Sequence, residues 1–129
     1  MLLTLLVGTP AFSADREKGL SAAQSGDFAT ALREWTPLAE RGNADAQFNL
    51  GTIYNKGQGV PQDQEAAVKW YRLAADQGIA NAQFNLGVMH QNGQGVPKDD
   101  KTAVMWYRLA AEQGAAIAQS NLGVMYAVG

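Results

Sequence analysis

The residue types that most often carry chemistry are scarce in this chain of 129 residues. There is no cysteine, which excludes disulfides, thiolate metal ligands and a cysteine nucleophile. His90 is the sole histidine, so no second imidazole can share a metal with it. It stands 36 residues from both Tyr54 and Tyr126, at a position that otherwise holds an aromatic side chain. We therefore predict no catalytic residue, no metal and no cofactor.

Two short segments with paired glycines resemble phosphate-binding loops. They are Gly57-Gln58-Gly59 and Gly93-Gln94-Gly95. Both lack the third glycine and the lysine of a P-loop. A proline follows each pair and removes an N–H group that an anion at the next helix start would need. We interpret these glycines as turn residues. Asp63 and Asp99, a few positions later, are interpreted as caps of the helices that follow.

Composition and charge indicate a folded protein that does not bind nucleic acid. Lysine and arginine total 10, aspartate and glutamate total 12, and the net charge is -2. A nucleic-acid-binding protein would show a basic excess. Hydrophobic residues make up 47% of the chain and charged residues 17%, which is not the composition of a disordered chain. The 22 alanines favour closely packed helices.

A period of 36 residues organises the chain from residue 45 onward. Residues 45–80 and 81–116 are identical at 23 of 36 positions, and residues 117–129 match residues 81–93 at 8 of 13. A more divergent copy precedes them. A period of this length predicts an array of helical units that bury their apolar stripes only by stacking.

Each repeat is predicted to contain two helices. Ala46, Leu50, Ile53 and Tyr54 recur at the spacing of one helical face. Glycine and proline separate this segment from a second one with the same periodicity. The predicted fold is all-α, a right-handed superhelix of antiparallel helix pairs. We expect helices near residues 15–25, 27–41, 44–56, 62–77, 80–92, 98–113 and 116–127.

Three motifs stand out in this period: Ala46-Gln47-Phe48-Asn49-Leu50-Gly51, Gly57-Gln58-Gly59-Val60-Pro61 and Trp70-Tyr71-Arg72-Leu73-Ala74-Ala75. They resemble the Sel-one-like repeat, a relative of the tetratricopeptide repeat. The resemblance implies an α-solenoid that binds other proteins or peptides, often as an adaptor or scaffold. The family also includes reported β-lactamase-like hydrolases, which are rich in cysteine. Since this chain has neither cysteine nor a Ser-x-x-Lys motif, we predict a non-catalytic protein.

The expected organisation begins with a segment outside the fold. Residues 1–14 resemble an incomplete secretory signal peptide, with an apolar run too short to span a bilayer and small residues before Asp15. The alternative is an apolar helical turn packed on the array. Export predicts a periplasmic or secreted bacterial protein with no membrane span after signal removal. The remaining units are a divergent helix pair at 15–43, repeats at 44–79 and 80–115, and the first helix of a further, truncated repeat at 116–129.

Residues that recur in every repeat are predicted to serve packing. Gly51, Gly87 and Gly123 are expected to allow close helix approach, because a mid-helix glycine otherwise costs about 1 kcal/mol. Trp70 and Trp106 are expected in the core. Three asparagines are expected to bind backbone groups of a neighbouring turn, or alternatively to grip a peptide backbone as a row. These are Asn49, Asn85 and Asn121.

Residues that differ between repeats are free to serve a partner. The resemblance to tetratricopeptide arrays implies that the first helix of each pair lines a concave groove. Phe48 and Phe84 would be its apolar anchors, with the amides of Asn55, Gln91 and Asn92 at its edge. The alternative is that both phenylalanines are core residues. The full predicted groove is Arg16, Leu20, Phe48, Thr52, Asn55, Lys56, Phe84, Val88, Gln91, Asn92, Ser120 and Val124.

A second function class stays open beside peptide binding. The last helix ends at Gly129, which aligns with Gly57 and Gly93, and its apolar stripe has no following partner. Terminal repeats normally carry a polar outer face. The alternative is therefore a structural segment of a longer solenoid, or a homo-oligomer that self-associates through this C-terminal helix.

Overall fold

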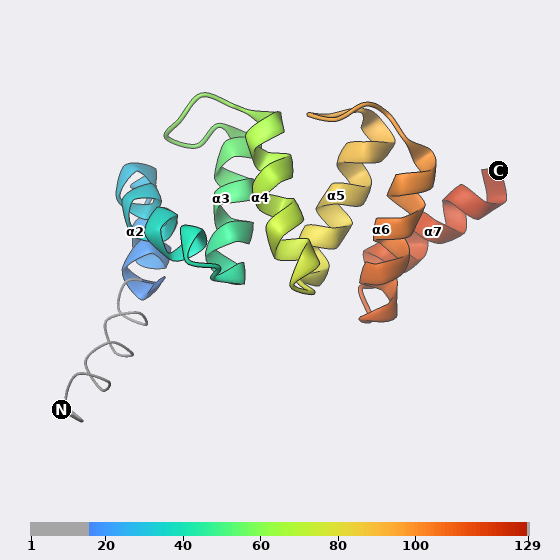
Figure 1. The fold of residues 1–129 in the computed structure, drawn as a ribbon, viewed down its shortest axis with the longest axis horizontal. Helices are drawn as coiled ribbons and strands as arrows, with labels where there is room; N and C mark the ends of the chain where they lie inside the picture. Colours follow the sequence, from blue (N-terminus) through green and yellow to red (C-terminus); the bar gives the residue numbers. More distant parts are fainter. Residues whose placement is uncertain (1–15, 129) are drawn as a thin grey trace.

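The computed structural model describes residues 16–128, and every regular element in that range is a helix. Residues 16–24 form the first helix. It is followed by α2 (Phe28–Glu40), α3 (Ala44–Lys56), α4 (Gln64–Asp76), α5 (Ala80–Asn92), α6 (Asp100–Glu112) and α7 (Ala116–Val128). The helices follow one another along the long axis, with residues 16–24 and α2 at one end and α7 at the other (Figure 1). The predicted all-α superhelix of helix pairs is confirmed.

Local sequence signals set the ends of these helices. Asp63 caps α4, since its side chain accepts a hydrogen bond from the backbone N–H of Ala66 at 3.0 Å. Asp99 caps α6 in the same way, through the N–H groups of Lys101 and Thr102. Gly57 ends α3 in the left-handed conformation with φ of 69°, which glycine adopts without steric cost. The glycine loops thus serve as turns between the two helices of a repeat.

The two helices of a repeat approach closely where glycine faces an aromatic ring. A Cβ atom added at Gly51 would lie 2.5 Å from a ring carbon of Tyr71, and one added at Gly87 would lie 2.5 Å from a ring carbon of Tyr107. The prediction of a close contact is wrong at Gly123, where nothing lies within 4 Å of that position. The reason is that no helix packs on this face of α7 within residues 16–128.

Tryptophans join neighbouring repeats. Trp70 of α4 is half-buried against the apolar cluster that contains Ala31 and Leu50 of the preceding helices. Trp106 of α6 is buried one period later, in the cluster that contains Tyr71 and Met89. Each indole therefore covers the helix pair before its own, and this burial stabilises the stack.

Buried glutamines connect three successive helices. The amide of Gln47 donates to the carbonyl of Ala39 at the end of α2 (3.1 Å), and its oxygen accepts from Gln77 at the end of α4 (2.9 Å). Gln83 and Gln113 repeat this arrangement one period later. Gln47 and Gln83 each add a side-chain hydrogen bond to a carbonyl at a helix C-terminus, which also accepts a backbone N–H from the following turn. Sequence reasoning missed this role, although the recurrence of both glutamines every 36 residues was a signal for it.

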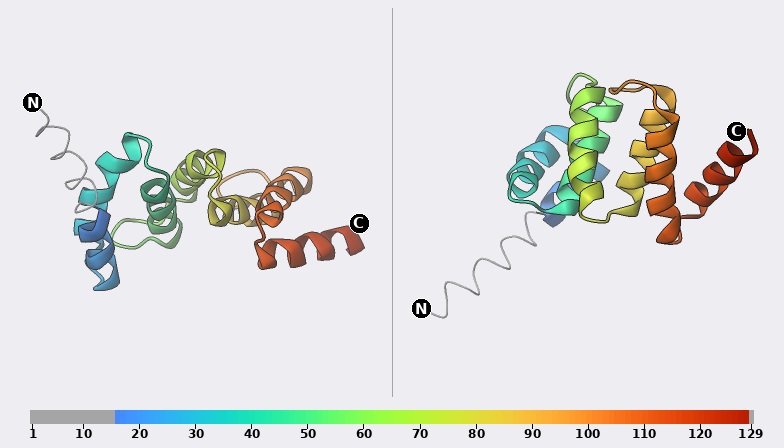
Figure 2. Two further views of the ribbon diagram at one scale, coloured as in Figure 1. Left: turned by 90° about the horizontal axis from the view of Figure 1, so that it is seen from below. Right: turned by 45° about the vertical axis from the view of Figure 1, so that its right-hand side comes forward.

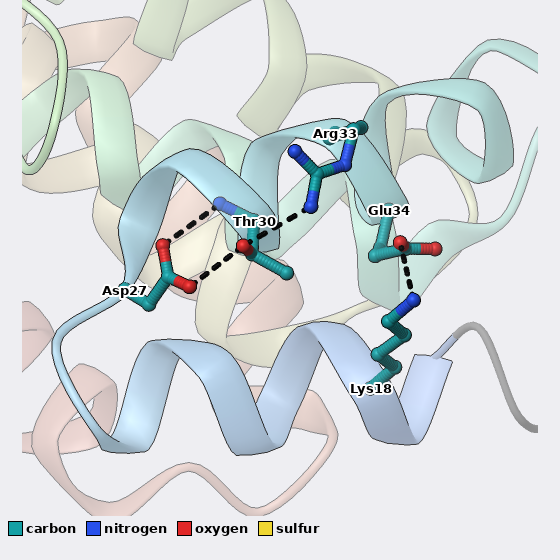
Figure 3. A network of polar contacts seen from close by, with 5 residues as sticks. All are labelled: Lys18, Asp27, Thr30, Arg33 and Glu34. Carbon is teal, nitrogen blue, oxygen red and sulfur yellow. Dashed lines mark hydrogen bonds and ion pairs between the residues drawn. The ribbon is translucent and has the colours of Figure 1, made fainter.

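Exposed polar contacts hold the first helix pair (Figure 3). Lys18 lies 3.4 Å from Glu34 across the pair. Asp27 caps α2 through the N–H and hydroxyl of Thr30, at 3.1 and 2.6 Å, and these hydrogen bonds lower the pKa of Asp27. Arg33 donates to the same hydroxyl. Because Lys18 and Asp27 face solvent, each of these contacts contributes little to stability.

No described helix has the length and hydropathy that a membrane span requires. Residues 1–14, predicted to be a signal peptide or a packed helical turn, lie outside the described residues. The array itself leaves α7 with helix neighbours on one side only (Figure 2).

Candidate binding surfaces

A buried tyrosine occupies part of the predicted groove in the first full repeat. Tyr71 is 1% exposed, and its ring centroid lies 5.7 Å from that of Phe48 with the planes tilted by 41°. Its hydroxyl lies 3.1 Å from Thr52 Oγ1, and Asn85 and Asn55 are further hydrogen-bond partners. Burial raises the pKa of Tyr71, and these hydrogen bonds partly offset the rise. The Tyr71 hydroxyl is thus uncharged, and its hydrogen bonds hold side chains of the predicted groove in place.

The second repeat contains the same arrangement around Tyr107. Its ring lies 5.7 Å from Phe84 at 41°, and its hydroxyl donates to Gln91 Oε1 at 2.7 Å. Asn121 is a further partner, as Asn85 is for the preceding tyrosine. Asn85 and Asn121 thus have tyrosine hydroxyls as partners, and their predicted contact with backbone groups stays a prediction. A buried hydroxyl within reach needs a partner, and the amide of the next repeat supplies it.

One hollow lies at the amino-terminal end of the array, and we call it the Phe48 hollow. It measures about 270 Å³ and lies between residues 16–24, α2 and α3. Its lining is Arg16, Leu20, Trp35, Asp45, Ala46, Phe48 and Asn49. Arg16 Nη1 lies 3.8 Å from Asp45 Oδ2 at the exposed rim. Leu20, which is 50% exposed, and Phe48, which is half-buried, give the hollow apolar walls.

A larger hollow of about 830 Å³ lies at the opposite end, and we call it the α6–α7 recess. It is lined by Gln91, Asn92, Lys98, Asp100, Lys101, Val104, Met105, Arg108, Val124, Met125 and Tyr126. Arg108 donates a hydrogen bond to the Tyr126 hydroxyl at 2.8 Å and thereby joins α6 to α7. This hydrogen bond also raises the pKa of Arg108. The sequence prediction named three of these residues and missed the contribution of α6.

The predicted groove residues are thus divided between two hollows. Arg16, Leu20 and Phe48 converge at one, and Gln91, Asn92 and Val124 at the other. The remaining predicted positions line neither hollow: Thr52, Asn55, Lys56, Phe84, Val88 and Ser120. Phe84 and Val88 pack instead against the cluster around Tyr107. In the first full repeat the Tyr71 hydroxyl engages Thr52 and Asn55, two of the side chains that the groove was expected to present.

His90 is partly buried, at the position that holds Tyr54 in the preceding repeat. Its Nδ1 atom is buried and has no hydrogen-bond partner among the described residues. Burial lowers the pKa of His90, with opposing contributions from the Asp99 carboxylate, which raises it, and the Arg72 guanidinium, which lowers it. Within residues 16–128, no group of three or more acidic, histidine or cysteine side chains has the arrangement of a metal site.

Antiparallel helix pairs stacked in sequence order, with hollows at both ends, define a tetratricopeptide-like α-solenoid. The Sel1 repeat family model matches residues 44–79, 80–114 and 116–129. The chain belongs to the Sel1 repeat family, as its motifs predicted. Sel1 repeats generally act as non-catalytic scaffolds for protein interaction.

Solved structures share this fold. A Sel1 repeat protein from Oxalobacter formigenes is 38% identical with a TM-score of 0.80, over 83% of this chain and 44% of its own. The c5321 protein, a protective antigen of uropathogenic Escherichia coli strains with an SLR fold, is 38% identical with a TM-score of 0.86, over 98% of this chain and 28% of its own. The chain therefore spans less than half the length of these two proteins.

A more distant structure shows the fold alone. The cysteine-rich protein B of Helicobacter pylori is 20% identical with a TM-score of 0.68, over 87% of this chain and 95% of its own. No curated protein matches the chain.

Proposed function

We propose that this chain is a non-catalytic adaptor module that binds a protein or peptide, and that an apolar side chain of the partner enters the Phe48 hollow. The observation that carries the proposal is the convergence of Arg16, Leu20 and Phe48, three residues of the predicted groove from two helices, on one hollow. The other predicted anchor, Phe84, lines neither hollow, although it packs against its tyrosine as Phe48 does.

The hollow has the chemistry of an anchor site for an apolar side chain. Leu20 and Phe48 supply apolar walls, and the exposed pair of Arg16 and Asp45 supplies polar contacts at the rim. Burial of one leucine-sized side chain contributes about 2 kcal/mol before the costs of association. With a net charge of -2, the chain offers little electrostatic steering, so affinity should depend weakly on salt.

A random peptide library displayed on phage and selected against the chain tests this proposal. We expect enrichment of peptides with an apolar anchor, and at least about tenfold weaker binding to Leu20→Glu. The control is Leu73→Glu, because Leu73 is similarly exposed, at 47%, but lines neither hollow. Absence of enrichment, or equal binding by both variants, would contradict the proposal.

The phenylalanines provide a second matched pair. Phe48 and Phe84 contact their tyrosines with the same centroid distance and tilt, so truncation of either removes the same ring contact. Only Phe48 lines one of the two hollows. Phe48→Ala should therefore lose the selected peptides while Phe84→Ala keeps them, with circular dichroism to show that both variants are folded.

The exposure of α7 favours a second candidate, in which the chain is a structural segment that assembles through this helix. Ile117, Val124 and Tyr126 are 64%, 61% and 59% exposed, although all three are apolar or aromatic. If assembly pairs two copies, sedimentation at micromolar concentration will show a dimer. A clean monomer rejects the homo-oligomer.

Export is a further part of the proposal, supported by the apolar run and small residues of the first 14 positions. We expect the exported protein to begin near Ala14 or Asp15 and to be found in the periplasm or outside the cell. Amino-terminal sequencing of protein recovered from the cell envelope checks this, and recovery of Met1 would refute it.

A further inference from the structure

Asn92 is the one asparagine of the chain that is followed by glycine. The other six asparagines precede alanine, leucine or lysine, and the equivalent turn of the preceding repeat carries Lys56 before Gly57. A side chain on the following residue shields the peptide nitrogen that joins it to the asparagine, and glycine has no side chain. At Asn92 and Gly93, the side-chain amide carbon and the next backbone nitrogen therefore meet with the least steric hindrance.

The turn after Asn92 is open in the structure. Asn92 is the last residue of α5, Gly93 follows it as the cap, and both are exposed. A Cβ atom added at Gly93 would lie 3.4 Å from its nearest neighbour, Lys98. At Gly57 the corresponding distance is 3.0 Å, to the backbone nitrogen of Gln62. Of the two equivalent turns, the one with the asparagine thus leaves more room for a change in backbone conformation.

One backbone hydrogen bond restrains the nitrogen of Gly93. Its N–H group donates to the carbonyl of Met89, one helical turn earlier. The same carbonyl also accepts from the N–H group of Gln94, at 2.9 Å. Because the Met89 carbonyl has two donors, it keeps a partner when Gly93 turns away. Helix ends open more readily than helix centres, so the nitrogen of Gly93 is released without unfolding of α5.

We propose that Asn92 is a site of covalent modification, at which it loses its side-chain amide by spontaneous deamidation. Solvent base takes the N–H proton of Gly93, and the bare nitrogen attacks Cγ of Asn92 to form a cyclic imide. The bond from Cγ to Nδ2 breaks, and this nitrogen takes up a proton and leaves as ammonia. Water then opens the ring at either carbonyl and gives aspartate or isoaspartate. Each conversion consumes one water and releases one ammonia, with no oxidant, reductant or second protein.

The glutamines that precede glycine are poorer sites. They are Gln58, Gln77, Gln94 and Gln113. Attack on a glutamine side chain closes a ring that is one atom larger, and it is slower because one more rotatable bond must be fixed. The amides of Gln77 and Gln113 are also engaged, since they donate hydrogen bonds to buried glutamines at 2.9 and 2.8 Å. Asn92 should therefore react before any of these glutamines.

Deamidation changes the end of α5 in two ways. It places a carboxylate at the helix C-terminus, where the helix dipole disfavours negative charge. Isoaspartate also adds a methylene to the backbone before Gly93, which alters the spacing between the turn and Met89. The backbone N–H of Asp99 donates to the carbonyl of His90 at 2.8 Å, so this turn ties the end of α5 to the start of α6. The modification should therefore loosen residues 92–99, whereas the hollow that carries the proposed function lies at the other end of the array.

Incubation of the folded chain at mildly alkaline pH, followed by peptide mapping in a mass spectrometer, tests this proposal. We expect the amide of Asn92 to convert at least about tenfold faster than that of Asn55, which precedes lysine. An isoaspartyl methyltransferase should label the product at position 92. Amide hydrogen exchange at residues 92–99 should be faster in the incubated chain than in the fresh one.

Asn92→Lys is the matched control, because it gives this turn the residue pair that Lys56 and Gly57 form in the preceding repeat. The variant should gain no methyl label at this turn, and its hydrogen exchange should not change on incubation. Survival of the Asn92 amide for as long as that of Asn55, or its conversion without faster exchange at residues 92–99, would overturn the inference.

Discussion

At the scale of single residues, recurrence predicts contacts only where the neighbouring repeat is present. Gly87 and Gly123 are the same residue at the same position of the period, yet one touches Tyr107 and the other touches nothing. The sequence predicted one role for both, because it shows a repeated residue without its surroundings. The difference makes the two glycines a matched pair for experiment.

We predict that Gly87→Ala lowers the free energy of unfolding by about 1–3 kcal/mol, because the added methyl group overlaps the Tyr107 ring. Gly123→Ala should leave stability unchanged or raise it by up to about 1 kcal/mol, since alanine favours the helix and meets no neighbour. Urea unfolding followed by circular dichroism measures both. Equal effects of the two substitutions would show that the Tyr107 contact does not explain why position 87 requires glycine.

His90 predicts how stability depends on pH. Burial lowers its pKa below 6.5 in the folded chain, so the unfolded chain binds the proton more tightly. Stability is therefore full above about pH 6.5 and declines as the pH falls toward the folded value. Tyrosine stands at the equivalent positions 54 and 126. A tyrosine side chain binds no proton in this pH range, since its ordinary pKa is about 10. His90→Tyr should flatten the decline between about pH 7.5 and 5.5 in thermal unfolding, and an unchanged slope would assign it to other groups.

At the scale of helices and turns, local sequence signals were sufficient to predict the helix caps and the turns. Asp63, Asp99 and Gly57 act on backbone groups within a few residues, and each is observed as the predicted cap or turn. The helices predicted at 62–77 and 98–113 begin two residues later and end one residue earlier, as α4 and α6. Contacts between helices were predicted less well. The glutamine links and the tyrosine hydroxyl bonds join side chains 16 to 30 positions apart, and which amide meets which oxygen depends on helix orientation.

The glutamine link is testable at Gln83. Gln83→Leu keeps the volume but removes the hydrogen bonds that Gln83 makes with the Ala75 carbonyl and with the Gln113 amide, so we expect a loss of about 1–3 kcal/mol in unfolding free energy. Gln119 makes the equivalent bond to Ala111 at 3.2 Å in an exposed place. Gln119→Leu should cost less than about 0.5 kcal/mol, because water can replace the lost amide. Equal losses of unfolding free energy for the two variants in urea would show that the burial of Gln83 does not determine the size of the effect.

At the scale of the whole molecule, each described repeat contacts mainly its neighbours, so the hollows depend on which helices meet. The Phe48 hollow lies where the divergent first pair meets the first full repeat, and the α6–α7 recess lies where α6 meets α7. A continuous groove was predicted from the sequence because the same positions were assigned to it in the first helix of every repeat. The hollows reflect differences between repeats, which explains why only half of the predicted residues line them.

The same one-dimensional order predicts a gradient of local stability. Helix α5 is packed between α4 and α6, whereas α7 contacts α6 and keeps an exposed apolar face. Stability in such an array is a sum of repeat and interface contributions, so a terminal helix with one interface opens first. Amide hydrogen exchange should be fastest in α7 and slowest in α4, α5 and α6. Gln83→Leu, which weakens a central link, should speed exchange in α5 more than in α7, and uniform exchange along the chain would show instead that the array unfolds as one cooperative unit.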